Sequence, residues 1–181
     1  MELKNAVDTC IATSLDGVPD GTCTKGPYGS IGLWDVSSAT DMTSIFAGAT
    51  SFNGGISKWD VSNVTSMYRM FYGATSFNSD ISEWDVSRVT NMGYMFHGAT
   101  SFNINILSWD VSKVSNMRYM FRDAASFART LCGAWRAPTA VKTDMFSGSG
   151  GKLCVSTGLF PTKSEWQALC VDCCTEPFPR R

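Results

Sequence analysis

Tyrosine and arginine side chains, with the chain's one histidine, recur at intervals of 25 residues through the middle of this 181-residue sequence. Tyr and Arg often anchor interfaces, because they offer large rigid contact areas and bidentate hydrogen bonds. They fall on the same few positions of the interval, so stacked intervals would gather them into one aromatic-basic band. We predict that this band binds a protein or glycan ligand. Its residues are Tyr68, Arg69, Tyr72, Tyr94, His97, Arg118, Tyr119 and Arg122.

Two alternatives to this band stay open at the level of sequence. The same positions would also suit a solvated surface, on which long side chains cover neighbouring apolar area. The opposite side of each unit is a second candidate face, small and polar in character. Its residues are Ser57, Lys58, Ser82, Glu83, Leu107 and Ser108.

The sequence gives little support to catalysis. A nucleophile needs a base within hydrogen-bond reach, and the only histidine, His97, occupies a repeat position filled elsewhere by Ala47, Tyr72 and Arg122. A phosphate-cradling glycine motif, an H-E-x-x-H metal site and a paired catalytic carboxylate are all missing from the sequence. We therefore expect a protein that is not an enzyme and uses no cofactor.

Acidic and amide residues form two further periodic sets, Asp35, Asp60, Asp85 and Asp110, and Asn53, Asn78 and Asn103. Such rows could supply calcium ligands. A turn repeated in every unit must also satisfy its backbone donors and acceptors in every unit, and short Asp, Asn and Ser side chains do so locally. We favour this structural role and expect no metal.

Hydroxyl residues recur as well, at Thr50, Thr75 and Thr100, each followed by a serine. A flat face with regular hydroxyls can match ordered water, so a structural or ice-surface-binding solenoid is the alternative function. Each hydroxyl pair stands between Gly-Ala and Phe-Asn, next to expected core residues. This placement favours a turn feature.

The residues above belong to one repeated phrase. Trp34, Trp59, Trp84 and Trp109 are spaced by 25 residues, and each opens the sequence WDVS. Fixed self-similarity of this length indicates stacked supersecondary units. Apolar positions shared between units are expected to form the core, and in the second and third units they are Val61, Val64, Met67, Met70, Phe71, Ala74, Phe77, Ile81, Val86, Val89, Met92, Met95, Phe96, Ala99, Phe102 and Ile106.

Each unit has two differently patterned sides. Val64, Met67, Met70 and Phe71 follow the three-and-four spacing of a helical face, whereas the segment 81–84 suits a short extended piece. The sequence therefore predicts an α/β repeat solenoid. We expect parallel strands on one side, about 4.8 Å apart, and short helical segments on the other.

The phrases WDVSNVTSMYRMFYGATSFN and WDVSRVTNMGYMFHGATSFN resemble the BspA-like family of surface-protein repeats. The resemblance covers about 100 residues. It implies a right-handed, leucine-rich-repeat-like coil, and adhesion or recognition at a cell surface. The pattern decays in the last unit, where Asp123 replaces the repeat glycine, Ala128 replaces its asparagine and Trp135 follows the preceding tryptophan by 26 residues.

All seven cysteines lie outside the regular repeat region, 34–127. Solenoid ends need special capping, so we predict an extracellular protein with disulfides in its caps, with Cys10 bonded to Cys23 and the C-terminal cysteines bonded among themselves. Zinc is the rival explanation, because Cys170, Cys173 and Cys174 resemble half of a metal site. The predicted organisation is an N-terminal cap (1–33), four repeats (34–133), and a degenerate coil with a Cys-rich cap (134–181).

Composition limits the partners. The formal net charge of −1 disfavours nucleic acid. Apolar runs are only a few residues long, far short of the roughly 20 that a membrane-spanning helix needs, so we expect no membrane insertion. The sequence does not decide the oligomeric state.

Overall fold

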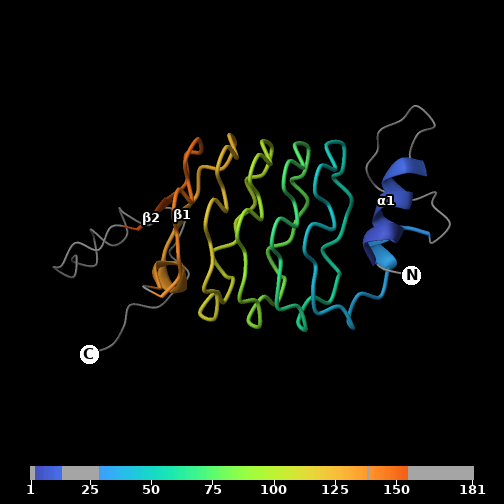
Figure 1. The fold of residues 1–181 in the computed structure, drawn as a ribbon, viewed down its shortest axis with the longest axis horizontal. Coiled ribbons are helices and arrows are strands. Elements are labelled where there is room, and N and C mark those ends of the chain that lie inside the picture. Colours follow the sequence, from blue (N-terminus) through green and yellow to red (C-terminus); the bar gives the residue numbers. More distant parts are fainter. Residues whose placement is uncertain (1–2, 14–28, 138, 155–181) are drawn as a thin grey trace.

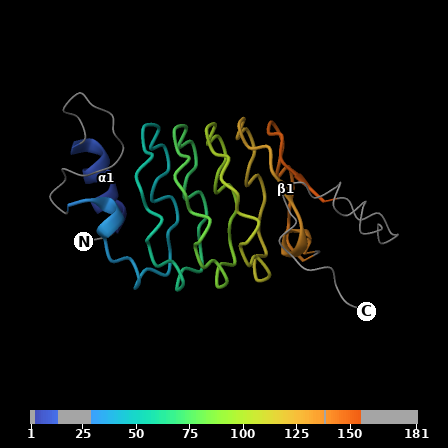
Figure 2. The same ribbon diagram turned by 180° about the vertical axis from the view of Figure 1, so that it is seen from behind.

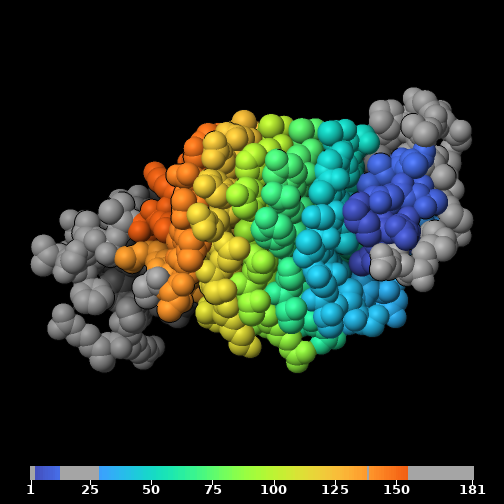
Figure 3. Space-filling model, in the orientation of Figure 1, coloured from blue at the N-terminus to red at the C-terminus, as the bar shows by residue number. Residues whose placement is uncertain are grey.

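The computed structural model describes residues 3–13, 29–137 and 139–154. Their helices and strands are α1 (Leu3–Thr13), the 3-10 helices η1 (Ile31–Leu33) and η2 (Gly133–Arg136), β1 (Thr130–Leu131) and β2 (Lys152–Leu153). Between α1 and β1 the chain forms successive coils that lie side by side in sequence order (Figures 1 and 2). Their side chains pack into one continuous body (Figure 3).

Isolated parallel bridges connect each coil to the next at one repeated position. They join Asp41 to Ser66, Ser66 to Asn91, Asn91 to Asn116 and Asn116 to Val141. All four bridges follow the 25-residue period of the sequence. The last brings in a segment beyond the regular repeats, so the coil stack continues to residues 141–148.

The segment 66–73 and its equivalents in the other coils form a continuous surface, here called the ladder face. In the second coil the amides of Met67, Arg69 and Phe71 donate to carbonyl oxygens of the third coil at 2.9 to 3.0 Å. The amides between them stay within the coil, as when Met70 donates to the Met67 carbonyl at 3.1 Å. Every second amide therefore bonds to the neighbouring coil, and the amides between them close tight turns within their own coil.

This arrangement differs from the helical segments expected here. An α-helix needs negative φ and bonds between residues four apart, whereas the fourth residue of every ladder segment has φ between 49° and 59°. These residues are Ser44, Arg69, Tyr94, Tyr119 and Asp144. The ladder face is thus built of turns, and in the described part of the chain α1 is the only α-helix.

The expected strand position also differs. Residues 81–84 form a turn, closed by a bond from the Trp84 amide to the Ile81 carbonyl at 3.2 Å, and not a strand. The isolated parallel bridges between coils lie on the face expected to be helical. Among the described residues, parallel pairing at the expected strand position occurs only at the end of the fourth repeat, where Leu131, the repeat equivalent of Ile81, pairs with Leu153. The hand of the coil and the kinship with leucine-rich repeats stay predictions.

The interior is a stack of aromatic and aliphatic side chains. All of the core positions predicted for the second and third units are buried, which confirms that prediction. Phe71 stacks on Phe77 within its coil, with ring centroids 3.8 Å apart, and on Phe96 of the next coil at 5.5 Å. Each coil therefore completes the core of its neighbours, as expected for stacked units.

The two ends are closed differently. At the N-terminal end α1 packs Val7 and Cys10 into the core. At the other end β1 pairs in parallel with β2, and a disulfide joins Cys132 to Cys154. This bond agrees with the predicted pairing among C-terminal cysteines. Of the other predicted disulfide residues, Cys23, Cys170, Cys173 and Cys174 lie outside the described residues.

Candidate ligand-binding band

The aromatic-basic band lies on the ladder face of the second, third and fourth coils. Arg69, Tyr94 and Tyr119 share one row, and each has its amide bonded to the next coil at 2.8 to 3.0 Å. A left-handed backbone costs a non-glycine residue roughly 1–2 kcal/mol, and these inter-coil bonds offset that cost. Ser44 and Asp144 adopt the same left-handed conformation outside the band. This conformation is therefore a feature of the fold and not of a ligand site.

Arg69 is at the centre of the N-terminal half of the band. Its guanidinium carbon lies 5.3 Å from the ring centroids of Tyr68 and Tyr72 and 5.2 Å from that of Tyr94. Cation–π attraction therefore holds the side chain over three rings drawn from two coils. No acceptor in the described chain bonds its guanidinium N–H groups.

The remaining rings form a second contact chain. Tyr72 stacks on His97, with centroids 4.9 Å apart and planes inclined by 25°. Tyr94 lies 4.8 Å from Tyr119. Arg118 and Arg122 both approach the Tyr119 ring, at 6.0 and 5.4 Å. The structure thus brings all eight predicted band residues into one contiguous cluster.

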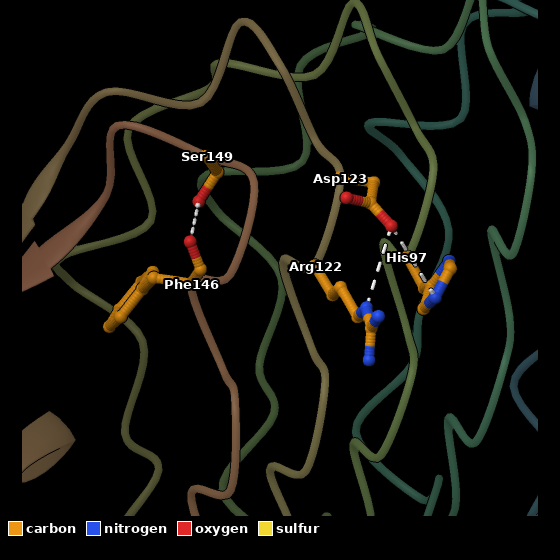
Figure 4. A network of polar contacts seen from close by, with 5 residues as sticks. All are labelled: His97, Arg122, Asp123, Phe146 and Ser149. Carbon is orange, nitrogen blue, oxygen red and sulfur yellow. Dashed lines mark hydrogen bonds and ion pairs between the residues drawn. The ribbon is translucent and has the colours of Figure 1, made fainter.

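Asp123 is a member of this cluster that the band prediction missed. Its carboxylate lies 3.5 Å from Arg122 Nε and 4.0 Å from His97 Nε2 (Figure 4). Beside it, Ser149 of the last coil donates its hydroxyl to the Phe146 carbonyl at 3.1 Å. The sequence signal for Asp123 is its departure from the glycine that the other repeats have at this position.

The pKa of His97 is lowered from 6.5, first because burial disfavours its charged form. Asp123 opposes the shift, whereas Arg122 and Arg69 add to it. The imidazole is therefore neutral at pH 7, so the fixed charges of the band come from its arginines and from Asp123.

Exposure is uneven along the band. Arg69, Tyr72 and Arg118 are exposed, with Tyr72 at 37%. Tyr68, Tyr94 and Tyr119 are half-buried. The cause is their mutual contact, since each ring covers part of its neighbour.

A family model matches residues 21–135, which include the whole band. The chain belongs to the family described as Mycoplasma protein of unknown function, DUF285. Members of this family are typically surface proteins. No curated protein and no solved structure matches the chain. The resemblance to BspA-like repeats, which is a finer assignment than DUF285, stays a prediction.

The aspartate row of this DUF285 chain bonds to its own turns. Asp60 accepts both the amide and the hydroxyl of Ser62, at 3.0 and 2.7 Å. The pKa values of all four carboxyls are lowered, first by the serine hydroxyl bond and next by the serine amide bond. In the described residues no group of three or more His, Cys, Asp or Glu side chains could hold a metal ion.

The amide and hydroxyl rows bond between coils. The Asn53 side-chain oxygen accepts the Asn78 amide at 2.8 Å, and Asn78 accepts the Asn103 amide at 2.9 Å. Thr75 and Thr100 donate their hydroxyls to carbonyls one coil earlier, at 3.1 and 3.2 Å. These side chains therefore hold neighbouring coils of the stack together.

The second candidate face has weaker internal order. Ser108 donates to the Ser82 carbonyl at 3.1 Å, Lys58 and Glu83 are exposed, and Leu107 is half-buried. Aromatic side chains do not take part in it.

A cavity of ≈ 880 Å³ between α1 and the first coil, lined by Leu3, Trp34 and Ala39 among others, includes none of the band residues.

Proposed function

We propose that this chain is a non-enzymatic recognition or adhesion module that binds a protein or glycan ligand through the aromatic-basic band of a repeat solenoid. The observation that carries the proposal is the gathering of four tyrosines and three arginines, from three coils, into one contact cluster. Tyr and Arg dominate binding hot spots when they cluster in this way.

The cluster is preorganised, which supports a binding role. Its backbone is fixed by hydrogen bonds between coils, and its side chains are held by ring and cation–π contacts. Little side-chain freedom would then be lost on binding, so more of the contact energy would appear as affinity. A merely solvated surface would not require this mutual packing of Tyr94, Tyr119 and Arg69.

An extracellular or cell-surface setting is part of the proposal. It is supported by the surface character typical of DUF285 members and by the Cys132–Cys154 disulfide, because disulfides persist mainly in oxidising compartments. Among the described residues, no helix is long and apolar enough to cross a membrane.

A non-catalytic function is supported by the surroundings of His97. The imidazole packs between Tyr72 and Tyr94, with centroids 4.9 and 5.8 Å away, and its nearest charged partner is Asp123 at 4.0 Å. No hydroxyl or thiol of the described chain bonds to it, so the nucleophile–base pairing that catalysis needs has no counterpart here.

The test is a binding screen against arrays of glycans and purified extracellular proteins, followed by paired variants. The double variant Tyr72→Ala with Arg122→Ala should weaken binding of the ligand found in the screen by about 2 kcal/mol or more, roughly 30-fold in Kd. The fold should survive, since surface changes usually alter stability by about 0.5 kcal/mol.

The matched control is Lys58→Ala with Glu83→Ala on the second candidate face. If this pair weakens binding and the band pair does not, the band assignment is wrong. Strong thermal hysteresis of a freezing solution would instead favour the ice-surface alternative.

A further inference from the structure

We propose that the aromatic-basic band takes an acidic oligosaccharide, whose sugar rings carry carboxylate or sulfate groups. The inference rests on the proposed function, because it names the ligand class of the same band. It follows from the charges, the open hydrogen-bond donors and the spacing of the cluster.

Within the described residues, the positive charge of the band is only partly compensated. Among the described residues, only Arg122 of the three band arginines has a carboxylate within ion-pair distance, Asp123 at 3.5 Å. Asp144 follows Tyr119 in the same row, one coil further on, but it forms no ion pair with Arg118 or Arg122. Arg69 and Arg118 are therefore exposed cations with no counter-ion among the described residues.

The hydrogen-bond donors of Arg69 are available in a fixed position. Tyrosine rings hold the Arg69 guanidinium at 5.2 to 5.3 Å but offer its N–H groups no acceptor in the ring plane. A guanidinium presents its donors in a planar fork that matches the two oxygens of a carboxylate or sulfate. The ring contacts thus orient a site for an oxyanion and leave it open.

The tyrosines add features that suit sugar rings. No described residue bonds to the hydroxyl groups of Tyr68, Tyr72, Tyr94 or Tyr119, so each can donate to and accept from a sugar hydroxyl. The exposed part of the Tyr72 ring also offers apolar area beside its polar tip. Tyr72 is exposed at the edge of the cluster, where a ring could stack.

The spacing favours a ligand with several anionic groups. Arg69 belongs to the second coil and Arg118 to the fourth, so their backbone positions lie two inter-strand spacings apart, about 10 Å. One small anion would engage one guanidinium at a time, whereas an acidic oligosaccharide could place separate groups on both. A single phosphate or a neutral glycan would leave part of this arrangement unused.

The experiment is calorimetric titration of the whole chain with four probes of matched length. They are a heparin hexasaccharide (sulfate), a hyaluronan hexasaccharide (carboxylate), the neutral chitohexaose and a hexaglutamate peptide. We expect at least one acidic sugar to bind about 10-fold or more tightly than the other two probes, and to weaken as salt rises. The two acidic arms show which oxyanion is preferred.

Variants then place the ligand. Arg69→Gln and Arg118→Gln should each lower the affinity for the acidic sugar about 10-fold, in keeping with the loss of a charge-assisted hydrogen bond. Arg88→Gln is the matched control, because the Arg88 guanidinium donates to Asn63 Oδ1 at 2.7 Å, outside the band. The Arg88→Gln variant should bind the acidic sugar with unchanged affinity. Melting curves check that all three variants fold.

Three outcomes overturn the inference: no binding of either acidic sugar, equal binding of chitohexaose or hexaglutamate, or equal loss in Arg88→Gln. If a different ligand still depends on Tyr72 and Arg122, the proposed function stands while the acidic-sugar inference falls. If no ligand of any class depends on those two residues, both fall.

Discussion

At the scale of single residues, the buried tryptophans connect each coil to the one before it. The Trp84 ring is 4% exposed, and its Nε1 donates to the Ile56 carbonyl at 3.1 Å. Trp59 and Trp109 make the same bond, to Ile31 and Ile81. Each ring thus fills the core and satisfies a carbonyl of the preceding coil.

Trp135 is the exception. It is fully buried, but its Nε1 has no hydrogen-bond partner among the described residues. The extra residue before Trp135 shifts the indole out of the register in which the other tryptophans bond. A buried donor left without a partner costs roughly 1–3 kcal/mol.

The two kinds of tryptophan give a matched prediction. Trp84→Phe keeps much of the apolar volume but leaves the Ile56 carbonyl without its donor, whereas Trp135→Phe removes a donor that has no partner among the described residues. We expect urea unfolding to show a loss for Trp84→Phe that exceeds the loss for Trp135→Phe by about 1–3 kcal/mol. Trp84→Ala should cost about 3–5 kcal/mol. Equal losses in the two Phe variants would contradict the role given to the indole bond.

His97 gives a prediction about pH. Its folded pKa is lowered from 6.5, so the folded state binds the proton less readily than the unfolded state. Its contribution to stability is therefore complete above pH 6.5 and is lost as pH falls from there towards the folded pKa. Denaturant titrations between about pH 5 and 7.5 should show this slope. His97→Gln should flatten it, and an unchanged slope would mean that another group titrates.

The aspartate row does not interfere in that window. The pKa values of Asp35, Asp60, Asp85 and Asp110 are lowered from 3.8, so their contribution is present above 3.8 and is lost only as pH falls further. The aspartate row therefore does not account for a loss of stability between pH 6.5 and about pH 5.

At the scale of elements, the sequence could predict which residues share a row but not the backbone that forms it. The 25-residue period places Tyr72, His97 and Arg122 at one position whatever the local conformation is. The spacing of Val64, Met67, Met70 and Phe71 marks them as buried, which they are, but tight turns bury the same positions as a helix. Only the alternation of amide bonds separates the two, and no side-chain pattern reports it.

Glycines at the end of the ladder face test this backbone directly. Gly73 has φ of 66°, and a Cβ built there would meet no atom within 4 Å. Gly73→Ala should therefore cost only the left-handed conformational penalty, about 1–2 kcal/mol. Gly55→Ala is the control, because its surroundings are equally open and its φ lies outside the left-handed range. If both substitutions change the unfolding midpoint equally, the left-handed conformation of Gly73 does not account for the loss.

At the scale of the whole molecule, stability is distributed along the coil stack. The ladder bonds and the phenylalanine stacks are made between nearest neighbours, from Phe46 through Phe71, Phe96 and Phe121 to Phe146. A protein of this kind approximates a sum of unit and interface terms. The coil number is then a variable that the fold tolerates, provided that the register is kept.

Removal of one whole repeat is the corresponding experiment. Deletion of 76–100 joins Thr75 to Ser101 and restores the phrase GATSFN across the junction. The shortened chain should fold cooperatively with a stability lower by about 1–4 kcal/mol, in proportion to the residues lost. Deletion of 76–99 removes one residue fewer and puts every later side chain one position out of register. That variant should lose the cooperative transition in thermal and urea unfolding, because Phe102 and Trp109 would no longer reach the core. If both deletions fold equally well, stability does not depend on register between coils, and the stacked-unit account of this chain fails.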